Sequence, residues 1–269
     1  MDDFKNFLFS LESRGAVKVE NIIDTNILNS INCDLIKNLN NFNLKNIPGS
    51  LMGNLNIQSC HIHTILWKEL IKSPLIQKLI NYNKAYKYVD FGGNVNLSGS
   101  KKQRLHVDGW GDNIILNVPL VNVSEFNGPI SLIHSNYDDK YDTYDIFAKS
   151  IYENEKFILT KLGDVLVRYE SIWHRGNCNY SGEARIMLSF TLRKDWPFED
   201  EINNRIEKKT EENKLIKFYG NIYGKGFMGR FVETIDFYFP FFLRPIIHGI
   251  NILKSIMSRV WSIIPKNYS

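Results

Sequence analysis

Cysteine is scarce in this chain, and disulfide chemistry is therefore not expected to organise it. The three cysteines, Cys33, Cys60 and Cys178, are an odd number without framework spacing. The first residues, Met1-Asp-Asp-Phe-Lys, carry acid where a secretory signal peptide would carry base. These features predict a reducing, cytoplasmic setting. Cys178 is expected to be a small buried residue, with a redox-sensitive position as the alternative.

The sequence also lacks internal repeats and a strong excess of charge. Of its 269 residues, 43% are hydrophobic and 23% are charged, which is typical of a globular chain of one large or two small domains. The net charge of +4 is unevenly placed, because residues 213–269 sum to +6 and residues 1–212 to −2. We expect no nucleic-acid partner.

Short strands are predicted to dominate residues 1–212, after N-terminal helices over 2–12 and 26–39 and a helical stretch over 67–80 that breaks near Pro74. The predicted fold is mainly β with flanking helices, built on a double-stranded β-helix (jelly roll, cupin-like) core. The expected strands are Tyr86–Phe91, Val95–Leu97, Leu105–Val107, Ile114–Leu120, Ile130–Ile133, Gly163–Tyr169 and Arg185–Leu192.

Residues 213–269 are predicted to form a basic, amphipathic helical appendage, preceded by a charged surface helix over 197–213. Charges recur within every window of about 20 residues, so this appendage is not expected to span a membrane. We expect it to pack on the core or across a dimer; the alternative is peripheral membrane contact through residues 237–264. Its apolar stripe consists of Ile246, Ile250, Leu253, Met257, Val260 and Ile264.

Two further features have alternative interpretations. The segment 135–161, with aspartates from Asp138 to Asp145 among tyrosines, is either a substrate lid or a solvated loop. The pair His61 and His63 could bind a metal, but no carboxylate or third ligand stands beside them. We expect them to be half-buried polar residues.

A second histidine pattern is more informative. In Gln103-x-x-His106-x-Asp108-Gly109, a histidine and a carboxylate lie two residues apart, and on a strand they would point to the same side. His174, at the end of a predicted strand, supplies a third ligand. Two histidines and one carboxylate form the facial triad of non-haem Fe(II) oxygenases. Arg185 follows and can bind a carboxylate through two nitrogens.

From about residue 94 to 192, the chain resembles the phytanoyl-CoA dioxygenase family of Fe(II)/2-oxoglutarate-dependent oxygenases. The matching pieces, in order, are Gln103-x-x-His106-x-Asp108-Gly109, Pro119-Leu120, Asn127-Gly128-Pro129-Ile130, Gly163-Asp164-Val165 and His174-Arg-Gly-x-x-Asn179-x-Ser181-x-x-x-Arg185. Two departures are Asn117, where an aromatic residue is common, and Ile133-His134-Ser135-Asn136, where the family usually has Pro-Gly-Ser-His.

The resemblance implies that His106, Asp108 and His174 bind iron and that Arg185 binds the distal carboxylate of 2-oxoglutarate. It places Gln103 and Asn117 beside the cosubstrate. With Fe(II), 2-oxoglutarate and O2 it implies hydroxylation of an unactivated carbon of a small-molecule or lipid-like substrate, with release of succinate and CO2. Related halogenases have a small residue in place of the carboxylate, so Asp108 favours hydroxylation.

Two other functions remain as alternatives. One is a cupin-like metal-dependent sugar isomerase or binding module without oxygen chemistry, against which Arg185 argues. The other is a membrane-surface scaffold with a degenerate site, against which the intact triad argues. The sequence does not identify the substrate or the oligomeric state.

Overall fold

The structure is a computed structural model that describes most of the chain. The described residues are 3–41, 52–82, 86, 88–109, 111–136, 141–194, 216–220, 231, 234, 235 and 237–263. The predicted surface helix over 197–213 and the division at residue 212 lie outside them, as do Asp138 and Asp139.

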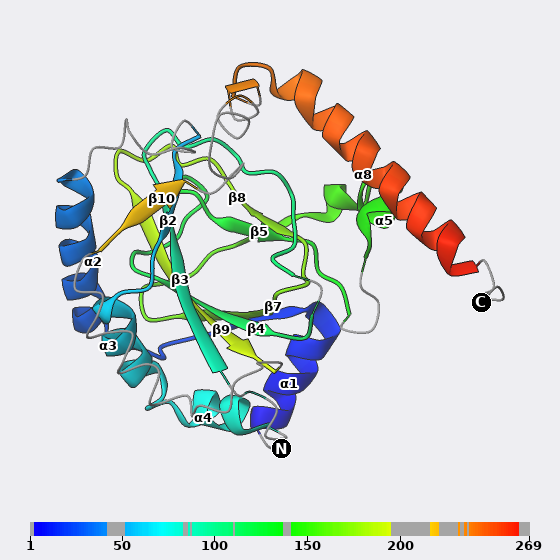
Figure 1. Cartoon of the computed structure of the whole chain (residues 1–269). Coiled ribbons are helices and arrows are strands. Elements are labelled where there is room, and N and C mark those ends of the chain that lie inside the picture. The colour runs from blue at the N-terminus through cyan, green and yellow to red at the C-terminus, as the bar shows by residue number, and fades with distance from the viewer. Residues whose placement is uncertain are drawn as a thin grey trace.

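Two antiparallel sheets form the centre of the molecule (Figure 1). The large sheet has the order β1 (Ala16–Val19), β7 (Val165–Tyr169), β4 (Ile114–Pro119), β9 (Arg185–Arg193), β3 (Tyr88–Asn96), β2 (Asn54–Ile57) and β10 (Phe218–Gly220). The small sheet has the order β6 (Lys156–Ile158), β5 (Ile130–Leu132) and β8 (His174–Gly176). The predicted mainly-β class with flanking helices is confirmed.

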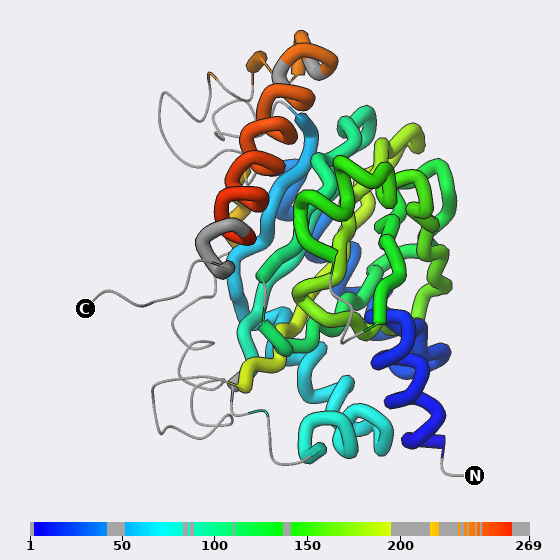
Figure 2. The backbone as a smooth tube through the Cα atoms, turned by 90° about the vertical axis from the view of Figure 1, so that its right-hand side faces the viewer, coloured from blue at the N-terminus to red at the C-terminus, as the bar shows by residue number. Residues whose placement is uncertain are grey.

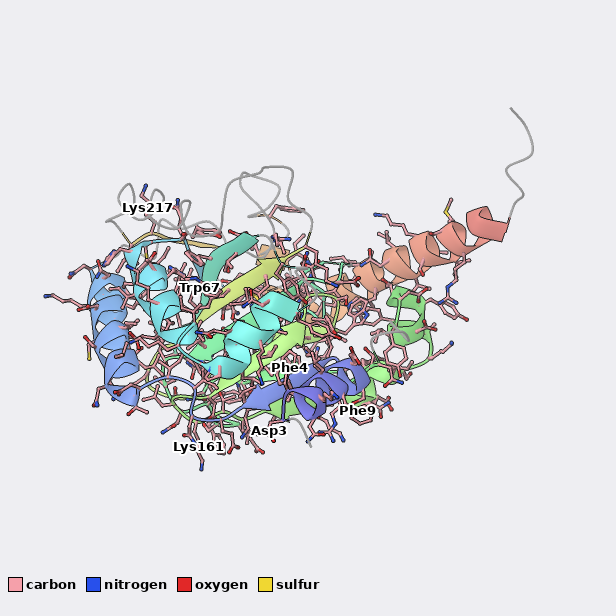
Figure 3. The ribbon with its side chains drawn as sticks, turned by 90° about the horizontal axis from the view of Figure 1, so that it is seen from below. Asp3, Phe4, Phe9, Trp67, Lys161 and Lys217 are labelled. Atoms are coloured by element: carbon pink, nitrogen blue, oxygen red, sulfur yellow. The ribbon has the colours of Figure 1, made fainter. Side chains whose placement is uncertain are left out.

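Four helices pack on one face of the large sheet: α1 (Asp3–Arg14), α2 (Thr25–Asn40), α3 (His61–Leu70) and α4 (Pro74–Asn81). Their buried aliphatic side chains join those of β2, β3, β4, β7 and β9 in one core. Trp67 of α3, labelled in Figure 3, stacks on Phe190 of β9 with ring centroids 5.7 Å apart. The helices thus cover one face of the sheet and leave the other face to the small sheet.

The period of two along β9 decides which side chains meet the small sheet. Ile186, Leu188, Phe190 and Leu192 are buried in the core under the helices. The alternate residues line a cavity on the opposite side of the sheet: Arg185, Met187, Ser189, Thr191 and Arg193. A slip of one residue would turn the four polar side chains of this set toward the apolar core, so the apolar residues of β9 fix which side its polar residues face.

Several strand predictions were wrong in detail. The two strands predicted over 86–91 and 95–97 are replaced by one strand, β3 (Tyr88–Asn96), and residues 105–107 make only an isolated bridge at His106. The strands β2, β6, β8 and β10 were not predicted. The shortest of them, such as His174–Gly176, have three residues and no apolar alternation, and they exist because a partner strand lies alongside.

The segment 135–161 is not a plain loop. Where described, it contains α5 (Thr143–Ala148), a 3-10 turn at Ile151–Asn154 and β6. The C-terminal helix α8 (Pro240–Ile263) lies beside α5 at the edge of the body (Figures 1 and 2). Among the described helices, none is both long enough and apolar enough to cross a bilayer.

Candidate metal centre

His106 and His174 are held side by side by their own backbones. The N–H of each residue donates to the carbonyl of the other, at 3.0 and 2.9 Å, and the ring centroids are 4.5 Å apart. Asp108 follows His106 by two residues. One ligand atom from each of these three residues falls within 4.8 Å of the others. The structure therefore brings the predicted triad together, although residues 105–107 are not a regular strand.

Both histidines present the same ring nitrogen to the centre. Nδ1 of His106 lies 2.8 Å from the carbonyl of Arg104, and Nδ1 of His174 lies 3.0 Å from that of Ile172. A carbonyl only accepts, so each Nδ1 carries the proton and each Nε2 keeps its lone pair. Those Nε2 atoms lie 3.8 and 3.4 Å from the Asp108 carboxylate. Burial lowers the pKa of His174 to about 3, which keeps its ring neutral.

Arg168 holds the Asp108 carboxylate in place, a role that sequence reasoning missed. Its Nη2 donates to Asp108 Oδ2 at 2.6 Å, and its Nε donates to Asn117 Oδ1 at 2.8 Å. Burial would raise the pKa of Asp108, but its electrostatic interaction with the His174 ring and with the Arg168 guanidinium lowers that pKa below its usual range. The available signal was a cation inside the apolar strand β7, where a charge is rarely buried unless it is paired.

The triad lies in a cavity of about 270 Å³ between the two sheets. Both the predicted metal ligands and the predicted cosubstrate-binding residues line this cavity. Its walls include Gln103, Asn117, Arg168, Glu170, Arg185 and Arg193 in addition to His106, Asp108 and His174. One cavity thus contains the candidate metal ligands and the candidate cosubstrate residues.

Arg185 is 2% exposed, yet no described acidic side chain forms an ion pair with it. Its Nε and Nη2 both donate to the carbonyl of Gly128, at 3.0 and 2.8 Å, and Nη1 donates to Asn94 Oδ1 at 3.3 Å. Guanidinium has five N–H donors, so further donors remain. Burial lowers the pKa of Arg185 to about 10, which reflects a cation that lacks a compensating anion.

The backbone conformation of Gly128 explains why a glycine is needed in the Asn-Gly pair before β5. Its φ of +79° is in the left-handed region, and a Cβ there would come within 2.5 Å of Asn96 Nδ2. This conformation turns its carbonyl to Arg185, as the two hydrogen bonds require. The Asn-Gly pair therefore positions the cation.

Gln103 and Asn117 both border the cavity, and each has one end of its amide fixed. Gln103 Oε1 accepts from the N–H of Gly176 at 2.8 Å, while Asn117 Oδ1 accepts from Arg168. With both oxygens occupied, the amide NH2 groups are the donors that remain for a ligand. The hydrogen bond that Asn117 accepts from Arg168 also holds the Arg168 side chain in position.

A second cavity of about 380 Å³ adjoins the first and shares Gln103 and His106 with it. Its remaining walls are largely apolar and come from four segments of the chain. They are Arg104, Leu105, Val107, Phe147, Trp173, Ile247, His248 and Asn251. Phe147 of α5 stacks on His248 of α8 at 3.9 Å, so the C-terminal helix forms one wall beside the triad.

His61 and His63 do not belong to either cavity. His63 is fully buried; its Nε2 lies 2.8 Å from the carbonyl of Gly92, and its Nδ1 lies 3.2 Å from the N–H of Cys60. The contact with Cys60 closes the first turn of α3, and the contact with Gly92 ties α3 to β3. His61 is half-buried as expected, whereas the expectation of a half-buried His63 is wrong. Cys178 is half-buried rather than buried as expected.

No family model matches the sequence, and no curated protein is similar enough to count as a relative. Solved structures do match in shape. HygX from Streptomyces hygroscopicus, with nickel and 2-oxoglutarate bound, is 11% identical with a TM-score of 0.53, covering 71% of this chain and 87% of that one. SnoN, a non-heme alpha ketoglutarate dependent epimerase from nogalamycin biosynthesis, is 14% identical with a TM-score of 0.57, covering 71% and 83%. These matches confirm the predicted jelly-roll fold.

Proposed function

We propose that this protein is an Fe(II)- and 2-oxoglutarate-dependent dioxygenase of the phytanoyl-CoA dioxygenase type. It hydroxylates an unactivated carbon of a small or lipid-like molecule and releases succinate and CO2. The observation that carries the proposal is a single cavity with two kinds of site. His106, Asp108 and His174 offer two neutral nitrogens and a carboxylate, and Arg185 is a buried cation without an acidic partner.

The donor set fits the metal. Two imidazole nitrogens with fixed tautomers and one carboxylate are the ligands of a non-haem iron site with open positions. His106, Asp108 and His174 would hold iron, which supplies the activation of O2 when 2-oxoglutarate is bound. In HygX, nickel or iron has been bound in the crystal.

The remaining residues of the two cavities would bind and orient 2-oxoglutarate and the substrate. Arg185 would pair with the distal carboxylate of 2-oxoglutarate, and the amide NH2 groups of Gln103 and Asn117 would donate to its oxygens. The substrate would occupy the second cavity, with its reacting carbon toward His106. The apolar side chains there, including Phe147 and Trp173, exclude water from the reacting centre.

Asp108 bears on the reaction type. Because a carboxylate is present, no ligand position is left to a halide, and hydroxylation is the favoured outcome. A sugar isomerase that uses metal alone would have no need for the unpaired cation of Arg185. Product analysis separates these reactions, and it also separates hydroxylation from an epimerisation such as that of SnoN.

Anaerobic titration tests the proposal. Purified protein should bind Fe(II) or Mn(II), and 2-oxoglutarate should then bind and raise the melting temperature. Under air, a metabolite screen should find a substrate that stimulates succinate release. Asp108→Ala is expected to abolish hydroxylation. Full activity of that variant, or absence of both metal and 2-oxoglutarate binding in the wild type, would refute the assignment.

A further inference from the structure

The C-terminal helix α8 is amphipathic, but it contacts the body through its polar side. Arg244 Nη2 donates to the carbonyl of Lys102 at 3.2 Å, and Ser255 Oγ donates to Asp142 Oδ2 at 3.0 Å. Arg259 Nε donates to the same Asp142 oxygen at 2.7 Å. Arg244, Ser255 and Arg259 recur at helical spacing with His248 and Asn251 of the second cavity, so they share one face.

The opposite face of α8 is apolar and open to solvent. Its residues also recur every three or four positions: Phe242 is 68% exposed, Ile246 46%, Ile250 47%, Leu253 62% and Met257 59%. Phe241, in the first turn, is 94% exposed. A surface helix normally turns such a stripe toward the core. The expectation was that this helix packs on the core or across a dimer. Packing of these residues on the core is contradicted by their exposure, while packing across a dimer stays a prediction. The stripe is an exposed apolar patch of the kind that marks an interaction site.

The charge of the helix indicates which partner fits. Residues 240–263 contain Arg244, Lys254 and Arg259 and no acidic residue. Lys254 is exposed, has no ion-pair partner among the described residues, and borders the apolar stripe next to Leu253. A long cationic side chain at the border of an apolar stripe can reach lipid headgroups while its stem stays with the apolar surface.

We propose that α8 docks in the plane of an anionic membrane surface, with the stripe Phe242–Met257 below the headgroups and Lys254 among them. Arg244 and Arg259 are bound to the body on the inner face, which leaves Lys254 as the cation beside the stripe. Exposed aromatic residues at one end and a cation at the border of an apolar stripe are typical of interfacial helices. The inner face of α8 lines the second cavity, so in the docked protein the helix lies between that cavity and the lipid surface.

Vesicle flotation tests this proposal without a substrate. The full-length protein is mixed with phosphatidylcholine vesicles that contain or lack phosphatidylserine. The wild type should float with the anionic vesicles. Phe242→Asp should weaken this binding about tenfold or more, because a buried aromatic side chain becomes charged. Lys254→Glu should weaken it as well and reduce its dependence on salt.

Phe126→Asp is the matched control, because Phe126 is also 68% exposed but belongs to the loop before β5 and not to α8. It should bind vesicles like the wild type. Equal binding by all variants, or no binding to anionic vesicles, would overturn the proposal. Sedimentation velocity tests whether a second copy of the chain covers the stripe instead. If the wild type is a dimer that does not bind vesicles, and Phe242→Asp is a monomer, then the stripe is a dimer interface and the membrane proposal is wrong.

Discussion

At the scale of single residues, the arginines near the cavity differ in whether they have an acidic partner. Arg168 pairs with Asp108, Arg175 with Glu155, and Arg193 lies 3.7 Å from Glu170. Arg185 is the most buried of these and has only neutral oxygens as partners. Burying a cation without an anion lowers the stability of the fold. A ligand that supplies a carboxylate would compensate the buried charge of Arg185.

Arg185→Gln is therefore expected to weaken 2-oxoglutarate binding by about 10–100-fold, the loss that charge-assisted hydrogen bonds imply. Calorimetry with Mn(II)-loaded protein measures this. Arg193→Gln is the control, because Arg193 faces the same cavity but already has acidic partners. Metal affinity should stay constant in both variants. Equal losses in the two would show that the total positive charge of the cavity, and not the buried guanidinium of Arg185 in particular, binds 2-oxoglutarate.

Arg168 is a positioning residue, since it contacts the carboxylate of Asp108 and not the metal. Arg168→Met should lower Mn(II) affinity by about 10–100-fold, as is common when the partner of a metal ligand is removed. Arg168→Lys should recover part of that loss, because an ammonium group can still reach the carboxylate. A purely structural role predicts instead a lower melting temperature with unchanged metal affinity in the protein that remains folded.

At the scale of elements, strand pairing explains how distant residues meet. Antiparallel pairing of β4 with β7 sets Asn117 opposite Leu166 and Ile115 opposite Arg168, so Asn117 and Arg168 project from neighbouring strands on the same side of the sheet. Pairing of β5 with β8 sets Leu132 opposite His174. The helices contribute no metal ligand among the described residues; they cover the far side of the large sheet.

One carboxylate makes several of the contacts between α5 and α8. Asp142 caps α5 by accepting from the N–H of Asp145, and it also accepts from Ser255 and Arg259 of α8. Asp142→Ala should therefore raise amide hydrogen exchange in α8 and α5 while the sheets stay protected. Asp112→Ala removes a comparable surface carboxylate beside Lys194 and should leave α8 unchanged. Unaltered exchange in α8 with Asp142→Ala would mean that other contacts hold the helix.

At the scale of the whole molecule, the sequence predicts those parts of the fold that local patterns determine. The triad was found because His106, Asp108 and His174 follow a recognisable order, and the longer strands show apolar alternation. The role of Arg168 was not predictable, because it depends on which strand lies beside β7. The orientation of α8 was not predictable either. Periodicity identifies an apolar stripe, but acidic side chains on α5 turn that stripe outward.

The buried His63 links the stability of the whole molecule to pH. Its ring is enclosed between α3 and β3, stacked on Phe91 at 5.8 Å, and burial lowers its pKa to about 4 from the ordinary value of 6.5. As the pH falls from 6.5 to about 4, His63 therefore binds a proton in the unfolded chain but not in the folded chain.

The free energy of unfolding should accordingly be largest above pH ~6.5 and decline by up to about 3 kcal/mol by pH ~4 through this residue. Urea unfolding at neutral pH and at pH about 4.5 measures the decline. His63→Gln lacks the titrating group, so its loss between the two pH values should be smaller, although His174 still contributes. His61→Gln, two residues away on α3 and half-buried, should decline like the wild type. If His63→Gln and His61→Gln show the same decline as the wild type, then the pKa of His63 is not lowered by folding, and the hydrogen bond that its Nδ1 accepts from the Cys60 N–H must be reinterpreted.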